Sequence, residues 1–323
     1  MTEHTRRAVL GGFSAFAAMP VFAQTAWPNR PITLMVGFAA GGPLDVVSRI
    51  IAQGLSKRLG QQVVLENRPG ATGTVAAGQI ARAHPDGYTL MAIPATYAAS
   101  AALFSKLSYR PIEDFSMISM TTEFPYVLVT YSDHPIRTMA DIVSAARSQN
   151  SPFTYGTSGV GSLQHLAVEH FANMAKIKLQ HVPYRGGAPA ISELLGKRID
   201  FVLDQPTALV EFIRDGRFRA LAVTGGERFF SLPDTPTISE AGFPGYAVTG
   251  WQGLVAPAGL PTPVLNRLHT ELTGILMEPA IVEQLRTLGN ETRPTTPDVF
   301  KARLRTEIET WTKVVAAAHI ERI

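Results

Sequence analysis

The stretch VGFAAGGPLDVVSRI, residues 36–50, places the end of an apolar strand, a loop of small residues and an amphipathic helix in immediate succession. Pro43 suits the first turn of a helix, and apolar side chains recur at helical spacing from Leu44 to Leu55. A helix start leaves its first N–H groups without partners and carries about half a positive charge. The stretch therefore predicts a cradle for an anion, although the loop contains neither lysine nor arginine.

The same order of strand, glycine-containing loop and helix returns in YGTSGVGSLQHLAVEHF, residues 155–171, where serine and threonine hydroxyls join the loop. The first loop taken alone is equally compatible with a tight turn that binds no ligand. Two such loops that face one cleft, however, could bind one carboxylate from both sides. A helix terminus contributes about 0.3–1 kcal/mol, and a hydrogen bond to a charged group about 1.5–3 kcal/mol. Micromolar affinity needs about 8 kcal/mol, so several N–H and hydroxyl groups must act together.

Strands and helices alternate along the chain, which is typical of mainly parallel sheets wound by helices. The pattern begins at Pro31 and restarts near Pro125. We expect a capping box of Thr138 and Asp141 at one helix start, and N-caps at Thr262 and Thr296 for two C-terminal helices. The predicted organisation is two lobes, with residues 24–128 and 250–323 in lobe 1 and residues 129–249 in lobe 2.

The first 23 residues have the pattern of an export signal rather than of a folded element. Arg6 and Arg7 precede a short apolar stretch that ends in small residues at Ala23, and glycines and a proline disfavour a buried helix there. The pair of arginines indicates a twin-arginine signal, with a general secretory signal as the alternative. We therefore expect cleavage near Ala23 and a soluble periplasmic protein.

Composition excludes several classes of protein. A formal net charge of +3 and the lack of a basic stripe with interleaved aromatics argue against nucleic acid as a partner. The chain contains no cysteine, which excludes disulfides, a thiol nucleophile and thiolate metal sites. With 46% hydrophobic and 17% charged residues, it has the composition of an ordinary globular protein.

Motifs for catalysis and metal binding are incomplete. The stretch from Gly156 to Val160 lacks the last glycine of a G-x-S-x-G elbow, and no G-K-[ST] cradle for a triphosphate occurs. His165 and His170 are one residue too far apart for an H-x-x-E-H zinc helix. We therefore predict no catalytic residue, no metal and no cofactor; the alternative is a hydrolase-like enzyme that uses Ser158 or Asp204.

Across nearly the whole mature chain, the sequence resembles the extracytoplasmic solute receptors of tripartite tricarboxylate transporters, the Bug proteins. The resemblance rests on an ordered set of stretches: WPNRPITLMVGFAAGGPLDVVSRIIAQGL, VLENRPGATGTVAAGQIARAHPDGYTL, YGTSGVGSLQHLAVEHF, HVPYRGGAPAISELLGKRIDF, RFRALAVTGGERFFSLPDTPTISEAGFPGY and WQGLVAPAGLPTPVLNRL. It implies a type II periplasmic-binding-protein fold, in which two lobes close over a small carboxylate for membrane transporter subunits. We expect a monomer.

The resemblance also implies a set of ligand-binding residues. One half of the carboxylate clamp is Phe38, Ala39, Ala40, Gly42 and Asp45. The other half is Thr157, Ser158, Gly161, Ser162 and His165. Asp204 matches the acidic residue that faces the cleft in the family. Where this chain departs from the family pattern, Tyr97, Gln205 and Trp251 either adapt the distal pocket to an aromatic or less polar ligand or pack between the lobes.

Overall fold

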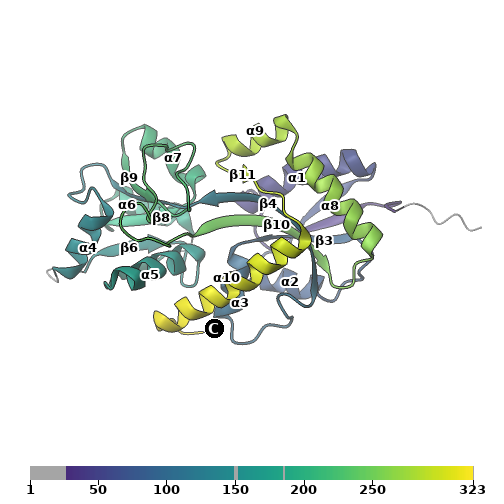
Figure 1. The fold of residues 1–323 in the computed structure, drawn as a ribbon, viewed down its shortest axis with the longest axis horizontal. Helices are drawn as coiled ribbons and strands as arrows, with labels where there is room; N and C mark the ends of the chain where they lie inside the picture. The colour runs from purple at the N-terminus through teal and green to yellow at the C-terminus, as the bar shows by residue number, and fades with distance from the viewer. Residues whose placement is uncertain (1–26, 149–151, 185, 323) are drawn as a thin grey trace, which may run out of the picture.

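The computed structural model describes residues 27–148, 152–184 and 186–322, so the predicted signal segment and its cleavage point lie outside the described residues. These residues form two β-sheets that lie side by side, each covered by helices (Figure 1). This arrangement confirms the predicted mixed α/β fold. Within the described ranges, no helix is long and apolar enough to cross a membrane.

The first sheet has six strands in the order β11-β4-β10-β3-β1-β2. Its strands are β1 (Ile32–Val36), β2 (Val63–Asn67), β3 (Thr89–Pro94), β4 (Phe115–Pro125), β10 (Thr249–Pro257) and β11 (Glu291–Thr292). β1 pairs in parallel with β2 and β3, whereas β10 runs antiparallel to both β3 and β4. The sheet is therefore mixed, because a strand from late in the sequence is inserted between two earlier ones.

The second sheet has five strands in the order β7-β6-β8-β5-β9. Its strands are β5 (Val127–Tyr131), β6 (Thr154–Thr157), β7 (Gln180–Pro183), β8 (Phe201–Asp204) and β9 (Phe218–Val223). β6 is parallel to β7 and β8, whereas β5 is antiparallel to β8 and β9. Both sheets thus combine a parallel group of strands with a reversed strand that comes from, or leads to, the other sheet, β10 in the first and β5 in the second. The short strand β11 is also reversed in the first sheet.

The helices lie against the faces of the two sheets and at their edges (Figure 1). They are α1 (Pro43–Leu59), the 3-10 helix Ala71–Gly73, α2 (Thr74–Ile80), α3 (Thr96–Leu103), α4 (Met139–Arg147), α5 (Leu163–Ala175), α6 (Gly187–Leu195), α7 (Pro206–Arg214), α8 (Thr262–Leu276), α9 (Pro279–Thr287) and α10 (Pro297–Ala317). α1 and α8 pack on each other, and α10 crosses from β4 and α3 to α5.

Several helix ends follow the local signals in the sequence. Thr138 and Asp141 form the predicted capping box, since each side chain accepts from a backbone N–H of the other residue. The Thr296 side chain caps α10 as predicted. The prediction for Thr262 was wrong: this threonine is the first residue of α8, and Pro261 occupies the N-cap. Pro261 has an extended backbone, which starts the helix one residue earlier than expected.

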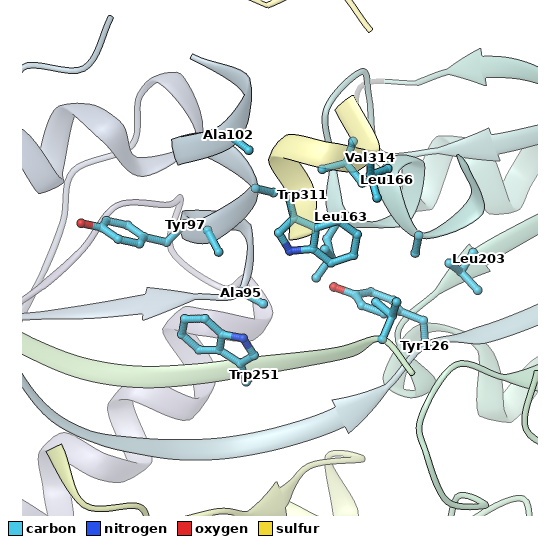
Figure 2. Close-up of a cluster of buried hydrophobic side chains, with 14 of the residues drawn as sticks. Ala95, Tyr97, Ala102, Tyr126, Leu163, Leu166, Leu203, Trp251, Trp311 and Val314 are labelled. Atoms are coloured by element: carbon cyan, nitrogen blue, oxygen red, sulfur yellow. The ribbon is translucent and has the colours of Figure 1, made fainter. Parts of the chain in front are cut away.

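A continuous apolar core runs from one sheet to the other beneath α3, α5 and α10. Trp311 of α10 is buried between Ala102 of α3 and Leu163 of α5 (Figure 2). The chain passes from the first sheet to the second at Pro125 and Tyr126, and it returns ahead of Thr249. The long strands β4 and β10 therefore reach from the first sheet toward the second (Figure 1).

Candidate ligand-binding cleft

A cavity of about 690 Å³ opens where the two sheets meet. It is lined by Phe38, Ala39, Ala40, Gly41, Gly42, Pro43, Leu44, Pro94, Ala95, Thr96, Phe124, Tyr126, Ser158, Gln164, Gly186, Gly187, Ala188, Asp204, Gln205, Thr207, Ala208, Gly250, Trp251 and Gln252. No lysine, arginine or histidine occurs among these described lining residues, and Asp204 is their one acidic side chain. An anion in this cavity would therefore meet backbone N–H groups, hydroxyls and amides.

The first loop lines the cavity. Phe38, Ala39, Ala40 and Gly42 all line it, and Gly42 is the N-cap of α1 with an extended backbone (φ −74°, ψ 166°). Gly41 has φ +80°, a conformation that favours glycine, and this residue turns the chain into the helix. The positive end of α1 therefore faces the cavity.

Asp45 does not line the cavity; it lies buried behind the loop. Its carboxylate accepts the Gly41 N–H at 2.9 Å, Nε and Nη2 of Arg49 at 2.9 and 3.1 Å, and the Asn67 amide at 2.9 Å. Burial would raise the pKa of Asp45, but the hydrogen bonds from Arg49, Gly41 and Asn67 outweigh it and lower that pKa. Asp45 therefore stabilises the conformation of the loop, and its carboxylate oxygens are already hydrogen-bonded within the protein.

The second loop places one of its predicted residues, Ser158, on the cavity wall. Thr157 is buried and bonds to His181 at 2.6 Å, while Ser162 caps α5 through the His165 N–H. His165 accepts the Gly161 N–H on Nδ1 and stacks on His181, with ring centroids 4.0 Å apart. These residues lie behind Ser158 and determine the shape of its loop.

The position of Ser158 gives it no activation as a nucleophile. Its Oγ donates to the Gln164 side-chain oxygen at 3.1 Å, and Gln164 Nε2 lies 3.4 Å from Asp204 Oδ1. In the part of the chain that the structure describes, the hydrogen-bond partner of Ser158 is thus an amide and not a base. The same described residues contain no group of three or more His, Asp or Glu side chains placed to hold a metal ion.

Asp204 lies at the end of β8 and lines the cavity while being 7% exposed. Its Oδ1 accepts the Gln205 N–H at 2.7 Å, and its Oδ2 lies against Gly187, where an added Cβ would approach it to 2.1 Å. Burial raises the pKa of Asp204, opposed by the hydrogen bonds from Gln205 and Gln164. Asp204 therefore takes up a proton more readily than an exposed aspartate does.

The cavity is also lined by the starts of two helices that were not predicted to bind the carboxylate. Gly186, Gly187 and Ala188 open α6, whereas Gln205 and Thr207 flank Pro206 at the first turn of α7. The sequence did contain a signal for the start of α6, because glycines between a strand and a helix occur there for a third time. The N-termini of α1, α6 and α7 therefore converge on the same cavity.

Of Tyr97, Gln205 and Trp251, the residues that were expected either to shape the distal pocket or to pack between the lobes, two line the cavity and one does not. Tyr97 does not line the cavity: its ring packs on Tyr109 and Phe115, its hydroxyl donates to the Pro111 carbonyl at 3.0 Å, and it points away from Tyr126 (Figure 2). Trp251 does line the cavity floor, although it is fully buried. Gln205, the third residue in question, also lines the cavity.

Trp251 is held by an ion network beneath the floor. Its indole N–H lies 2.8 Å from both oxygens of Glu307, and Glu307 pairs with Arg303 at 2.9 Å. Arg303 also contacts Glu123 of β4 and Thr249 of β10, at 2.6 Å each. Burial raises the pKa of Glu307, opposed by Arg303 and Trp251. One arginine of α10 thus joins the two strands that connect the sheets.

The profile of the tripartite tricarboxylate transporter family receptors matches residues 47–317. The chain belongs to this family. It is 32% identical over 312 residues to protein BugT of Bordetella pertussis, which covers 95% of each chain. A protein encoded in the ttuE–ttuC′ intergenic region of Agrobacterium vitis is 38% identical over 301 residues, covering 92% of this chain and 86% of the relative.

Solved structures of the family agree with the fold. The periplasmic binding protein BugD shares 33% identity with a TM-score of 0.77, covering 91% of this chain and 99% of BugD. MatC of Rhodopseudomonas palustris, solved with bound malate, shares 34% identity with a TM-score of 0.77 over 90% of this chain and all of MatC. An R. palustris protein solved with adipate shares 34% identity with a TM-score of 0.81 over 92% and 100%.

Proposed function

We propose that this receptor is exported to the periplasm and closes over a small carboxylate, which it delivers to the membrane subunits of a tripartite tricarboxylate transporter. The ligand is held chiefly by backbone N–H groups at helix N-termini, and the contacts that we assign from the predicted set are Phe38, Ala39, Ala40, Gly42, Ser158 and Asp204. The other predicted residues of the two loops support these contacts from behind.

The observation that carries this proposal is the convergence of the α1, α6 and α7 N-termini on one cavity between the sheets. The N–H groups of Ala39, Ala40 and Gly42 make no hydrogen bond of normal geometry within the described residues, although Gly42 closes a weak turn that begins at Ala39. Three hydrogen bonds to a carboxylate at about 1.5–3 kcal/mol each, with about 0.3–1 kcal/mol from each helix terminus, reach the roughly 8 kcal/mol of micromolar binding.

Relatives supply the chemical class of the ligand. MatC was solved with malate and the second R. palustris protein with adipate, and both ligands are carboxylates. The family description supplies the transporter as the partner. For export, the predicted signal with Arg6 and Arg7 supports removal of residues 1–23, and sequencing of periplasmic material should find Gln24 at the new N-terminus.

A thermal-shift screen of carboxylates tests the receptor function. A bound ligand at about 100 times its dissociation constant stabilises the protein by about 2.7 kcal/mol, which is readily measured as a rise in Tm. The bound compound is then recovered and identified. We expect it to return chemically unchanged; turnover would favour an enzyme, and a complete lack of carboxylate binding would refute the proposal.

A further inference from the structure

Gln252 is a polar residue of the cavity lining. It lies on β10, which is paired with β3 on one side and with β4 on the other, and its side chain is 4% exposed. The residue lines the cavity, yet its Oε1 is buried without a hydrogen-bond partner among the described residues. This amide is therefore placed where an apolar side chain would be expected.

Two threonine hydroxyls also lack a hydrogen-bond partner. Thr122 of β4 lies directly opposite Gln252 in the antiparallel register, so the two side chains are neighbours on one face. Thr96, just after β3, lines the same cavity. Both Oγ1 atoms are buried and lack a partner within the described ranges. Thr122 is fully buried and does not itself line the cavity, so we call Gln252 and Thr96, which do, the floor subsite.

Each buried polar group without a hydrogen-bond partner lowers the stability of the fold by about 1–3 kcal/mol. Two such groups facing one cavity therefore suggest that a ligand supplies the missing partners. A ligand hydroxyl is a good match, because it donates one hydrogen bond and accepts others. It can donate to the Gln252 oxygen or accept from the Thr96 hydroxyl, the two groups that line the cavity. A saturated hydrocarbon chain at the same place would leave all of these groups without partners.

We propose that the floor subsite binds a hydroxyl group of the ligand, so that the receptor selects hydroxycarboxylates over the parent carboxylates. This inference rests on the proposed receptor function and deepens it. The carboxylate lies at the N-terminus of α1, and the hydroxyl-bearing carbon faces β10. A ligand without the hydroxyl binds at least about tenfold more weakly, because Gln252 then stays unpaired.

Matched pairs of ligands test the selection. Titration calorimetry of the purified mature protein compares malate with succinate, 3-hydroxybutyrate with butyrate, and mandelate with phenylacetate. We expect at least one hydroxylated member to bind about tenfold or more tighter than its parent. Gln252→Leu removes the amide at nearly constant volume and should bring that ratio to about one. Gln252→Met serves the same purpose if the leucine variant does not fold.

Thr273→Val is the matched control. The Thr273 hydroxyl is also buried without a partner in the described structure, but this residue lies on α8 and does not line the cavity. The control variant should keep the wild-type ratio. Carboxylate binding without a preference for hydroxyl, or a preference that survives in Gln252→Leu, would overturn the inference and leave the receptor function intact. A failure of every carboxylate to bind would refute both.

Discussion

Leu103 occupies the space in which any residue other than glycine at position 161 would carry its side chain. A Cβ on Gly161 would lie 2.0 Å from Cδ2 of Leu103, and Gly161 has φ +74°. Leu103 ends α3 beside the first sheet, whereas Gly161 belongs to the loop that precedes α5 beside the second. The two halves of the molecule thus contact each other through a leucine seated on a glycine, behind the wall that Ser158 contributes to the cavity.

We predict that Gly161→Ala destabilises the protein more than backbone strain alone does. The matched control is Gly216→Ala, where φ is +69° but no atom lies within 4 Å of the added Cβ. Strain should cost about 1–2 kcal/mol in both variants, and the collision with Leu103 should add to it in the first. Urea unfolding measures the difference. The double variant Gly161→Ala, Leu103→Ala should lose the collision, and equal stability of the two glycine variants would contradict the prediction.

Removal of a single N–H from the first loop should weaken ligand binding. The φ of −74° at Gly42 is compatible with proline, and its N–H makes no hydrogen bond of normal geometry within the described residues. Gly42→Pro should therefore lower affinity by roughly 10-fold or more, the equivalent of one hydrogen bond to a carboxylate. Gly42→Ala keeps the N–H and, with its Cβ 3.5 Å from the nearest atom, should bind almost as wild type does. Equal affinities would remove the Gly42 N–H from the site.

The stacked pair of His165 and His181 makes stability depend on pH. Burial lowers the pKa of His165 to about 4, and burial with the neighbouring His165 lowers that of His181 to about 3. Unfolded histidines, with a pKa of 6.5, bind protons first as the pH falls, so these residues reduce the free energy of unfolding below about pH 6.5 and down to their folded values. For His165 the full loss is on the order of 3 kcal/mol.

The measurement is urea unfolding at several pH values between about 7 and 4.5. Glu169 and Asp204 oppose the trend, because burial raises their pKa values and the folded state then takes up protons readily. Comparison with His165→Asn isolates the histidine contribution: asparagine keeps an acceptor for the Gly161 N–H and does not titrate. The variant should show less acid destabilisation than wild type, and parallel curves would disprove the assignment.

The ion network beneath Trp251 should be costly to break. Glu307→Gln keeps the shape of the side chain but removes the charge that faces Arg303 and weakens the acceptor of the indole N–H. The pair is partly buried, with 26% of the Arg303 side chain and 18% of the Glu307 side chain exposed, and Arg303 keeps Glu123 as a partner, so the loss should be about 1–3 kcal/mol. Glu211→Gln breaks the exposed pair with Arg214 and should change stability by less than about 1 kcal/mol. Similar losses in the two variants would show that the network is not a stabilising contact.

Parts of the fold that depend on neighbours in sequence were predictable. The first strand, the helix that Pro43 opens and the capping box at Thr138 all appear where the residues indicated them. By contrast, β4 and α3 were not predicted. β4 contains buried serine and threonine and is a strand because β10, more than a hundred residues later, pairs with it. α3 is short, has no side-chain cap, and packs against α10.

The sequence by itself determined the family, the two sheets wound by helices and the succession of strand, small-residue loop and helix at residues 36–50. Tertiary structure alone decided which side chains reach the cavity: Asp45 and Tyr97 were expected there but bond to other parts of their own lobe, while Gln252 and the start of α6 line it. Local signals act over one helical turn, and a sequence pattern records them. The lining of a cleft depends on contacts between segments far apart in the chain, which no local pattern contains.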